Sequence, residues 1–333
     1  MRALRSDRGQ ARRRAAPGCF DPWPGSERLR PLAALVLGMM AASVLAACSP
    51  AALLGLVQPR AAGGEVRDVV YASGTRGKMD LYVPAAAERP PPVVVFFYGG
   101  GWKAGDRAMY RFVGRYLAAC GFLTIIPDYR VWPETGFDGF MKDSAAAVAA
   151  ARREAPRYGG DPSRLFLMGH SAGAHIAAML ALDPAWLAGA DVDTRTALSG
   201  VVGLAGPYDF LPLNDPVLEQ IFAPVGPRTQ PITFAANATA PFLLLTGADD
   251  QTVRPANSTR LAARINAHGG QARTVVYPAL SHVAIVGSLA APLRFLAPVR
   301  EDVCRFLGTR SQEALSTAPA ARNTPTARNT IAR

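Results

Sequence analysis

The chain has 333 residues, of which 50% are hydrophobic, and its formal net charge at pH 7 is +11. This length and composition allow one large or two ordinary domains with a sizeable buried core. Residues 1–47 carry a net charge of +5 and residues 309–333 one of +3, so only +3 remains for the residues between them. This small charge gives little reason to expect a nucleic-acid partner, and the sequence shows neither a recognition helix nor zinc-finger spacing. We therefore expect no nucleic-acid partner.

Residues 1–47 have the organisation of an export signal. An Arg-rich lead precedes an apolar run from Leu32 to Ala47, which is shorter than the roughly 20 residues of a membrane-spanning helix. Leu45-Ala46-Ala47-Cys48 resembles the bacterial lipobox. That resemblance implies cleavage before Cys48, lipidation of its thiol, and, with Ser49 next, retention in the outer membrane facing the periplasm. A plain signal peptide and an uncleaved anchor are the alternatives.

The segment that follows, residues 48–64, is small, apolar and glycine-containing. Such a composition is typical of a flexible tether between a lipid anchor and a folded domain. We therefore place the folded domain at residues 65–308, after this linker.

Strand-like and helix-like segments alternate through that domain. The run Val93–Phe97 is short and β-branched or aromatic, as a strand buried on both faces should be. Apolar residues then recur at helical spacing between Asp106, a possible N-cap, and Gly121, a helix stop: Met109, Phe112, Val113, Tyr116, Leu117 and Cys120. Further strands are predicted at 122–127, 164–168, 200–204, 242–246 and 273–277, and further helices at 140–158, at 256–267 and up to about 307. The alternation predicts an α/β fold, with a mainly parallel central sheet flanked by helices on both faces.

A glycine loop follows the first of these strands, where Phe97 runs into Tyr98-Gly99-Gly100-Gly101-Trp102. Consecutive glycines expose backbone N–H groups and let a substrate approach closely. We predict that the amides of Gly100 and Gly101 belong to an oxyanion hole and that Trp102 borders the substrate. The alternatives are a flexible glycine turn and a purely packing role for Trp102.

A candidate nucleophile lies in Gly169-His170-Ser171-Ala172-Gly173, which matches the G-x-S-x-G pattern. The pentapeptide follows a predicted strand and precedes an apolar helical segment, which is the context that this motif requires. Small neighbours are needed because a tight strand-to-helix turn brings other backbone segments close. We predict Ser171 as the nucleophile and the amide of Ala172 as the third oxyanion donor; the alternative is a structural Gly-Ser turn.

The base for such a serine is one of four histidines. His170 and His175 lie too close to Ser171 in the chain to fold back on it, and His268 precedes two glycines at a predicted helix end. His282 follows the last predicted strand, in the position where this fold places its base. Elimination therefore selects His282 as the general base, against the alternative of an ordinary loop histidine.

The acid that orients the imidazole lies between the serine and the histidine in the chain. The strand at 242–246 runs into a loop with two carboxylates, Asp249 and Asp250. Asp250 stands three residues after Gly247 and three before Val253, a spacing seen in this loop of related hydrolases. We predict Asp250 as the acid and Asp249 as a turn or capping residue.

Beyond the domain, residues 309–333 are rich in Ala, Thr, Arg and Pro without apolar periodicity, which predicts a disordered tail. The domain itself contains two cysteines, Cys120 and Cys304. An oxidising compartment would permit a bridge between them, and two separate buried thiols are the alternative.

Taken together, these motifs resemble the esterase/lipase branch of the α/β-hydrolases, in particular carboxylesterases of the feruloyl-esterase and kynurenine-formamidase-like group. The resemblance covers roughly residues 66–307. It is strengthened by three stretches typical of that group: Asp128-Tyr129-Arg130, Tyr158-Gly159-Gly160-Asp161-Pro162 and Gly206-Pro207-Tyr208-Asp209-Phe210. One departure is that the group's HGGG loop begins with His, whereas this loop begins with Tyr98.

The resemblance implies a serine hydrolase that cleaves small carboxylic esters through an acyl-enzyme, with no metal and no cofactor. It also implies that Asp128 and Arg130 brace the glycine loop. Tyr208 and Phe210 are expected to line the substrate pocket, a role in the core being the alternative. Amide cleavage by a formamidase or an exopeptidase is an alternative activity, because the same triad serves both bonds. A non-catalytic lipoprotein that binds a ligand is the alternative outside the enzymes.

Overall fold

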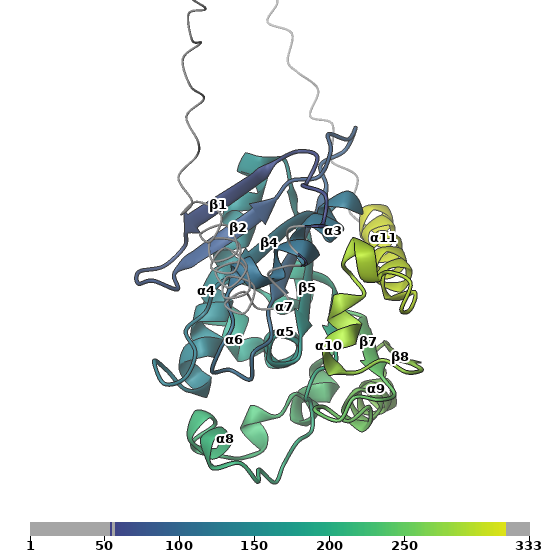
Figure 1. Ribbon diagram of the computed structural model, residues 1–333. Helices are drawn as coiled ribbons and strands as arrows, with labels where there is room; N and C mark the ends of the chain where they lie inside the picture. The colour runs from purple at the N-terminus through teal and green to yellow at the C-terminus, as the bar shows by residue number, and fades with distance from the viewer. Residues whose placement is uncertain (1–53, 55–56, 318–333) are drawn as a thin grey trace, which may run out of the picture. The chain divides into compact units, whose positions relative to one another are not determined.

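An eight-stranded sheet in the order β1-β2-β4-β3-β5-β6-β7-β8 carries the fold (Figure 1). The structure is a computed structural model that describes residue 54 and residues 57–317. The strands are β1 (Glu65–Val70), β2 (Lys78–Tyr82), β3 (Pro92–Phe97), β4 (Leu123–Pro127), β5 (Asp161–His170), β6 (Leu198–Leu204), β7 (Phe242–Gly247) and β8 (Ala272–Tyr277).

The sheet is antiparallel only at one edge, where β2 pairs with β1 and with β4. From β4 to β8 all neighbouring strands run parallel. The central strands are buried on both faces; in β3, for example, every residue from Val93 to Phe97 is buried. This explains why their sequences are continuous apolar runs rather than alternating patterns.

Helices cover both faces of the sheet. The α-helices are α3 (Arg111–Ala119), α4 (Phe137–Glu154), α5 (Ala172–Leu182), α6 (Pro184–Ala188), α7 (Thr194–Ala197), α8 (Pro216–Ile221), α9 (Ala256–Ala267), α10 (His282–Gly287) and α11 (Val299–Thr317). Short 3₁₀ helices are η1 (Arg107–Tyr110), η2 (Ala155–Tyr158), η3 (Pro227–Thr229), η4 (Pro231–Asn237) and η5 (Ala291–Leu293). Helices α4, α5 and α6 pack against one another, whereas α3 and α11 lie side by side elsewhere on the sheet (Figure 1). The predicted α/β fold with a mainly parallel sheet is thereby confirmed.

Helix α5 is buried along its whole length, since every residue from Ala172 to Leu182 is buried. A helix that is apolar on all sides has no face to offer to water and needs this central place. None of the helices in the described part of the chain combines the length and the apolar character that crossing a membrane would require.

The strand register brings the functional loops to one edge of the sheet. Phe97 at the end of β3 pairs with Gly169 near the end of β5, and His170 pairs with Leu204 at the end of β6. Gly247 at the end of β7 pairs with Tyr277 at the end of β8. The loops that follow β3, β5, β7 and β8 therefore leave the same edge, where open parallel sheets bind their ligands.

Two of the expected segment boundaries are wrong. Residues 57–64, expected as part of the tether, pack on the domain: Gln58 is buried, its carbonyl accepts a hydrogen bond from Arg115 at 3.1 Å, and its side-chain oxygen accepts one from the Ala291 amide at 2.6 Å. The expected tail from residue 309 begins instead as helix, because α11 continues to Thr317. Ser311 is buried there and accepts a hydrogen bond from Arg164 at 3.0 Å. Residues 1–53 and 318–333 lie outside the described residues.

A disulfide joins Cys120, at the end of α3, to Cys304 in α11, with the two Cα atoms 6.1 Å apart. The two cysteines are separated by 184 positions in the sequence. The bond ties helix α11 to the rest of the domain. A cross-link of this span also restricts the unfolded chain strongly, which stabilises the folded state.

We expect reduction of this disulfide to lower the free energy of unfolding by about 2–5 kcal/mol, through the regained freedom of the unfolded chain. Thermal unfolding with and without dithiothreitol measures the effect. The double variant Cys120→Ala/Cys304→Ala is the control. Its melting temperature should match that of the reduced protein and should not change when the reductant is added. An equal melting temperature for the oxidised and reduced wild type would contradict the expectation.

Candidate active site

Ser171 occupies a strained turn between β5 and α5. Its backbone is left-handed, with φ 54° and ψ −122°, a conformation that a residue with a side chain rarely adopts. The turn is held because the Ser171 amide donates to the Leu204 carbonyl at 2.9 Å. A Cβ atom on Gly169 would clash with the Gly173 carbonyl, and one on Gly173 with the Phe97 carbonyl. Both glycines of the motif are therefore required by close backbone approach.

The structure brings Ser171, Asp250 and His282 together in one chain of hydrogen bonds. His282 Nε2 lies 2.8 Å from Ser171 Oγ, and His282 Nδ1 lies 2.8 Å from Asp250 Oδ2. The second carboxylate oxygen, Asp250 Oδ1, accepts from the amides of Thr252 and Val253 at 2.9 and 2.7 Å. The Asp250 side chain has no exposed surface and that of His282 is 13% exposed. Asp249 is exposed and makes no such contact.

This arrangement defines the protonation of the imidazole. A carboxylate at Nδ1 favours the tautomer with its proton on Nδ1, which leaves the Nε2 lone pair free to accept the Ser171 proton. A proton taken up at Nε2 in this arrangement would create an imidazolium beside the buried carboxylate, which stabilises such a charge. His282 is the first residue of α10, whose N-cap Ser281 accepts from the Ala284 amide at 3.4 Å.

The glycine loop lies directly against Ser171. The position of a Cβ atom on Gly99 would be 3.1 Å from Ser171 Cβ, so a side chain here would crowd the serine. Gly100 and Gly101 both have positive φ, 140° and 61°, a region that only glycine enters without cost. The Gly100 carbonyl accepts from the amides of Lys103 and Ala104, which closes the loop into a tight turn.

Tyr98, which stands where the related loops have His, is fully buried beneath this turn. Its ring stacks on Tyr129, with centroids 4.5 Å apart. The Tyr129 hydroxyl donates to the Tyr98 carbonyl at 2.7 Å, and Arg76 donates to the Tyr98 hydroxyl at 3.1 Å. Burial raises the pKa of Tyr98 well above its usual value, so the hydroxyl stays neutral. An aromatic stack thus supports the loop from below.

Asp128 anchors the same region, as the resemblance implied. It accepts from the Arg107 amide at 2.8 Å and pairs with the Arg107 guanidinium, which also donates to Asp80 at 2.8 Å and pairs with Asp68. Burial raises the pKa of Asp128, against the opposing effect of Arg107. Arg130 instead pairs with Asp143 at 2.8 Å in a partly exposed position.

Trp102 is 4% exposed and packs in an aromatic cluster. Its ring stacks with Phe210 at 5.8 Å and meets the edges of Phe222 at 4.7 Å and His175 at 5.2 Å. Phe210 is only half-buried, so it is the member of this cluster with the most exposed surface.

Tyr208 does not line the site. Its side chain has no exposed surface, and Gly203 and Gly206 leave the space that its ring fills, since a Cβ atom on either would clash with it. This contradicts the expected substrate contact. The segment between β6 and β7 turns Tyr208 inward, and the Asn257 side chain accepts a hydrogen bond from its amide at 2.9 Å.

Sequence reasoning set aside two histidines that the structure places around the nucleophile. His170 is buried behind His282, and its pKa is lowered to about 3 by burial and then by the neighbouring His282. His175 is buried in the aromatic cluster, where burial lowers its pKa to about 4, and its Nε2 lies 2.8 Å from the Thr229 carbonyl. Tyr110, at 3.1 Å from His170 Nδ1, carried no motif that could have singled it out.

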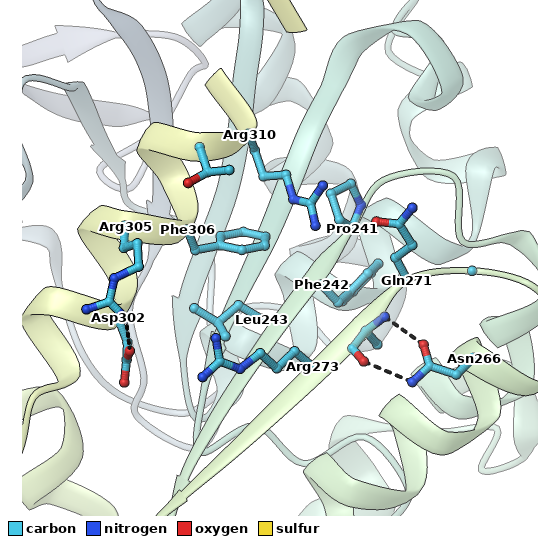
Figure 2. A pocket seen from close by; sticks show the side chains of 13 residues that line it. Pro241, Phe242, Leu243, Asn266, Gln271, Arg273, Asp302, Arg305, Phe306 and Arg310 are labelled. Carbon is cyan, nitrogen blue, oxygen red and sulfur yellow. Dashed lines mark hydrogen bonds and ion pairs between the residues drawn. The ribbon is translucent and has the colours of Figure 1, made fainter. Parts of the chain in front are cut away.

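A separate cavity of about 430 Å³ lies at the opposite end of β7 and β8 (Figure 2). Its lining includes Phe242, Asn266, Arg273, Arg305, Phe306 and Arg310, and none of the triad residues. Within the described residues, no group of three or more His, Cys, Asp or Glu side chains is arranged to hold a metal ion.

The two buried histidines predict an acid-sensitive fold. An unfolded histidine has a pKa near 6.5, so below that pH the unfolded chain binds protons that folded His170 and His175 refuse. The free energy of unfolding should therefore fall as pH drops from about 6.5 towards 4, by up to about 1.4 kcal/mol per pH unit for each histidine.

Urea unfolding at pH 7.5, 6.5, 5.5 and 5.0 measures this slope. The variant His175→Gln removes one of the two groups and should lose about half of the slope attributed to the pair. A slope that is unchanged in this variant would show that His175 does not contribute.

Comparison with known proteins places the chain. A family model described as BD-FAE matches residues 79–265, more than half of the chain. An isoprenylcysteine alpha-carbonyl methylesterase of Arabidopsis thaliana is 30% identical over 250 residues, covering 68% of this chain and 58% of that protein. The esterase LipQ of Mycobacterium tuberculosis is 30% identical over 205 residues, covering 56% of this chain and 48% of that protein.

This chain spans 57–60% of the length of four plant relatives of the methylesterase type. Among solved structures, a truncated carbohydrate esterase from gut microbiota superimposes with a TM-score of 0.65 at 22% identity, covering 74% of this chain and 96% of the other. That likeness concerns the fold. Because this family model matches more than half of the chain, the chain belongs to the BD-FAE family of α/β-hydrolase-fold esterases.

Proposed function

We propose that this hydrolase cleaves small carboxylic esters by two-step acyl transfer, with Ser171 as nucleophile, His282 as general base and Asp250 as the orienting acid. The observation that carries the proposal is the pair of 2.8 Å contacts from the His282 ring, one to Ser171 Oγ and one to a buried carboxylate. A serine hydroxyl is a weak nucleophile until an adjacent base accepts its proton.

In the first step His282 Nε2 takes the hydroxyl proton while Ser171 Oγ bonds to the ester carbonyl carbon, and the carbonyl oxygen becomes an oxyanion. The amides of Gly100, Gly101 and Ala172 are the donors that we assign to this oxyanion. Ala172 is the first residue of α5, so its amide is one of the unpaired donors at a helix N-terminus. The helix dipole adds a favourable partial charge.

In the second half of this step the imidazolium gives its proton to the leaving alcohol oxygen as the carbon–oxygen bond breaks. The acyl group remains on Ser171. A water molecule, deprotonated by His282, then attacks the acyl carbon, and the same amides hold the second oxyanion. This second intermediate collapses as the bond between the acyl carbon and Ser171 Oγ breaks, and His282 gives the proton that it took from water to Ser171 Oγ, so the acid is released and the serine is restored. Every proton moved in this cycle passes through His282 Nε2.

Esters are favoured over amides because the relatives that cover most of this chain are named as methylesterases and esterases. We place the acyl or alcohol part of the substrate against Phe210 and the exposed edge of the Trp102 cluster. Val283, which follows the base and is 67% exposed, offers a second apolar contact at the mouth of the site.

Substitution at the triad tests the mechanism. Ser171→Ala should lower kcat for a short-chain nitrophenyl ester by about 10⁶-fold and abolish labelling by a fluorophosphonate, since the attacking oxygen is gone. Asp250→Asn should lower kcat by about 10⁴-fold, because the wrong imidazole tautomer is then held.

The matched control is Asp249→Asn, one position away on an exposed side chain, which should leave kcat within a factor of two. Loss of turnover in Asp249→Asn with normal turnover in Asp250→Asn would reverse the assignment. Parallel assays with N-formylkynurenine and a dipeptide amide separate esterase from amidase activity. Folded wild-type protein that resists the fluorophosphonate would favour the non-catalytic ligand-binding lipoprotein.

We further propose that the protein is exported and held by a lipid on Cys48 in the outer membrane of a bacterial cell envelope, facing the periplasm. The sequence around Cys48 supports this, although Cys48 lies outside the described residues. The disulfide between Cys120 and Cys304 is typical of proteins that fold in oxidising compartments such as the periplasm.

Metabolic labelling with an alkyne-tagged fatty acid tests this anchor. We expect the wild type to carry the label and to sediment with the outer membrane, and Cys48→Ser to lose the label and to leave that fraction. Full labelling of Cys48→Ser would contradict the site, and unlabelled wild type would point to a plain signal peptide or an uncleaved anchor.

A further inference from the structure

A chain of buried hydrogen bonds runs behind the triad, from Tyr110 through His170 to the backbone of the base. The Tyr110 hydroxyl lies 3.1 Å from His170 Nδ1, and His170 Nε2 lies 3.0 Å from the His282 carbonyl oxygen. Tyr110 is 7% and His170 4% exposed, so water does not compete for these partners.

The His282 carbonyl fixes the direction of the hydrogen bonds in this chain. A backbone carbonyl only accepts, so His170 Nε2 carries a proton and donates it to His282. The neutral imidazole then accepts at Nδ1, and the Tyr110 hydroxyl donates to it. Each of the three groups therefore has the partner that its chemistry requires.

We infer that Tyr110 and His170 are positioning residues of the catalytic site, which fix the backbone of the base His282 relative to the glycine loop on either side of Ser171. This inference rests on the proposed function. The hydrogen-bond partner of Ser171 Oγ is His282 Nε2, whereas Tyr110 and His170 bond to each other and to the His282 carbonyl, so both act on the reacting atoms only through the backbone of His282.

Three parts of the site meet at His170. It is the chain neighbour of Ser171, its Nε2 bonds the backbone of His282, and the position of a Cβ atom on Gly99 would lie 2.9 Å from its Nδ1. Nucleophile, base and oxyanion loop come from segments far apart in the sequence. Because His170 contacts all three segments, this one residue limits how far they can move relative to one another.

The neutral state of His170 matters for the base as well. The rings of His170 and His282 have centroids 5.0 Å apart. A positive charge on His170 would oppose the imidazolium that forms on His282 during turnover. The Tyr110 hydroxyl and the His282 carbonyl together favour the neutral tautomer of His170 with its proton on Nε2. This tautomer carries no charge that would repel the imidazolium, and it gives the His282 carbonyl a hydrogen-bond donor.

Side-chain replacements that differ in one donor test the inference. His170→Leu keeps a buried side chain but removes the donor to His282, whereas His170→Gln retains an amide N–H that can reach the same carbonyl. We expect His170→Leu to lower kcat by about 10–100-fold with KM changed by less than about threefold, as displacement of a catalytic group does. If His170→Leu lowers kcat by about 100-fold, the kcat of His170→Gln should be at least about tenfold higher than that of His170→Leu.

Tyr110→Phe removes only the hydroxyl that sets the tautomer, and it should lower kcat by about 3–10-fold at constant KM. Its matched control is Tyr116→Phe, a buried tyrosine that instead donates to the Arg300 carbonyl at 2.5 Å. Tyr116→Phe should lose comparable stability without a change in kcat. Should His170→Leu fail to fold, the comparison of Tyr110→Phe with Tyr116→Phe still decides.

Folded His170→Leu or Tyr110→Phe with wild-type kcat would overturn the inference, and so would His170→Gln that is as impaired as His170→Leu at the same melting temperature. The rate at which a fluorophosphonate labels Ser171 is followed in each variant beside ester turnover. Wild type that labels but does not hydrolyse esters counts against the proposed substrate class, and the labelling rates then test the positioning role on their own.

Discussion

The strained turn at Ser171 depends on how closely three backbone segments approach one another. The carbonyl of Phe97 lies where a side chain on Gly173 would be, and the carbonyl of Gly173 lies where one on Gly169 would be. Backbone strain of this kind costs about 1–3 kcal/mol and persists only where the surroundings over-determine it. Here the parallel pairing of β5 with β3 and β6 provides that constraint. Without the close approach the hydroxyl would not reach the histidine and the glycine loop at once.

The glycine loop shows how a changed side chain is accommodated. Tyr98 stands in place of histidine; its carbonyl accepts a hydrogen bond from Tyr129, and its hydroxyl accepts one from Arg76. Asp128, in the same region, pairs with Arg107. Buried polar groups are costly unless each finds a partner, and in this region almost every one does. The backbone donors of Gly100 and Gly101 are independent of what lies below them, so the loop tolerates the replacement while its support is rebuilt.

The second feature of the site is that its buried histidines are neutral. His170 and His175 flank the nucleophile along β5 and α5, and both are held neutral by burial. The only partly exposed imidazole of the three is that of His282, which faces a buried carboxylate. Burial thus separates the histidine that we propose as the general base from the two that are held neutral.

The sequence by itself determined the fold class. It also selected the candidate site residues: Ser171, the glycine loop, His282 and, through spacing, Asp250 rather than Asp249. Each of these is written locally, as a strand followed by a motif, in a chain order that the fold constrains. Most helix and strand positions followed from periodicity, but β1 (Glu65–Val70), β2 (Lys78–Tyr82) and the short helices α6, α7, α8 and α10 did not, since four to six residues show too little of a period.

Only the tertiary structure decided the rest. It placed Tyr208 in the core, packed Gln58 and Ser311 onto the domain, joined Cys120 to Cys304, and brought Tyr110 behind His170. These outcomes depend on which side chain fills a space or satisfies a partner many positions away. A local pattern fixes which face of an element is apolar, but it carries no information on the neighbour that this face will meet.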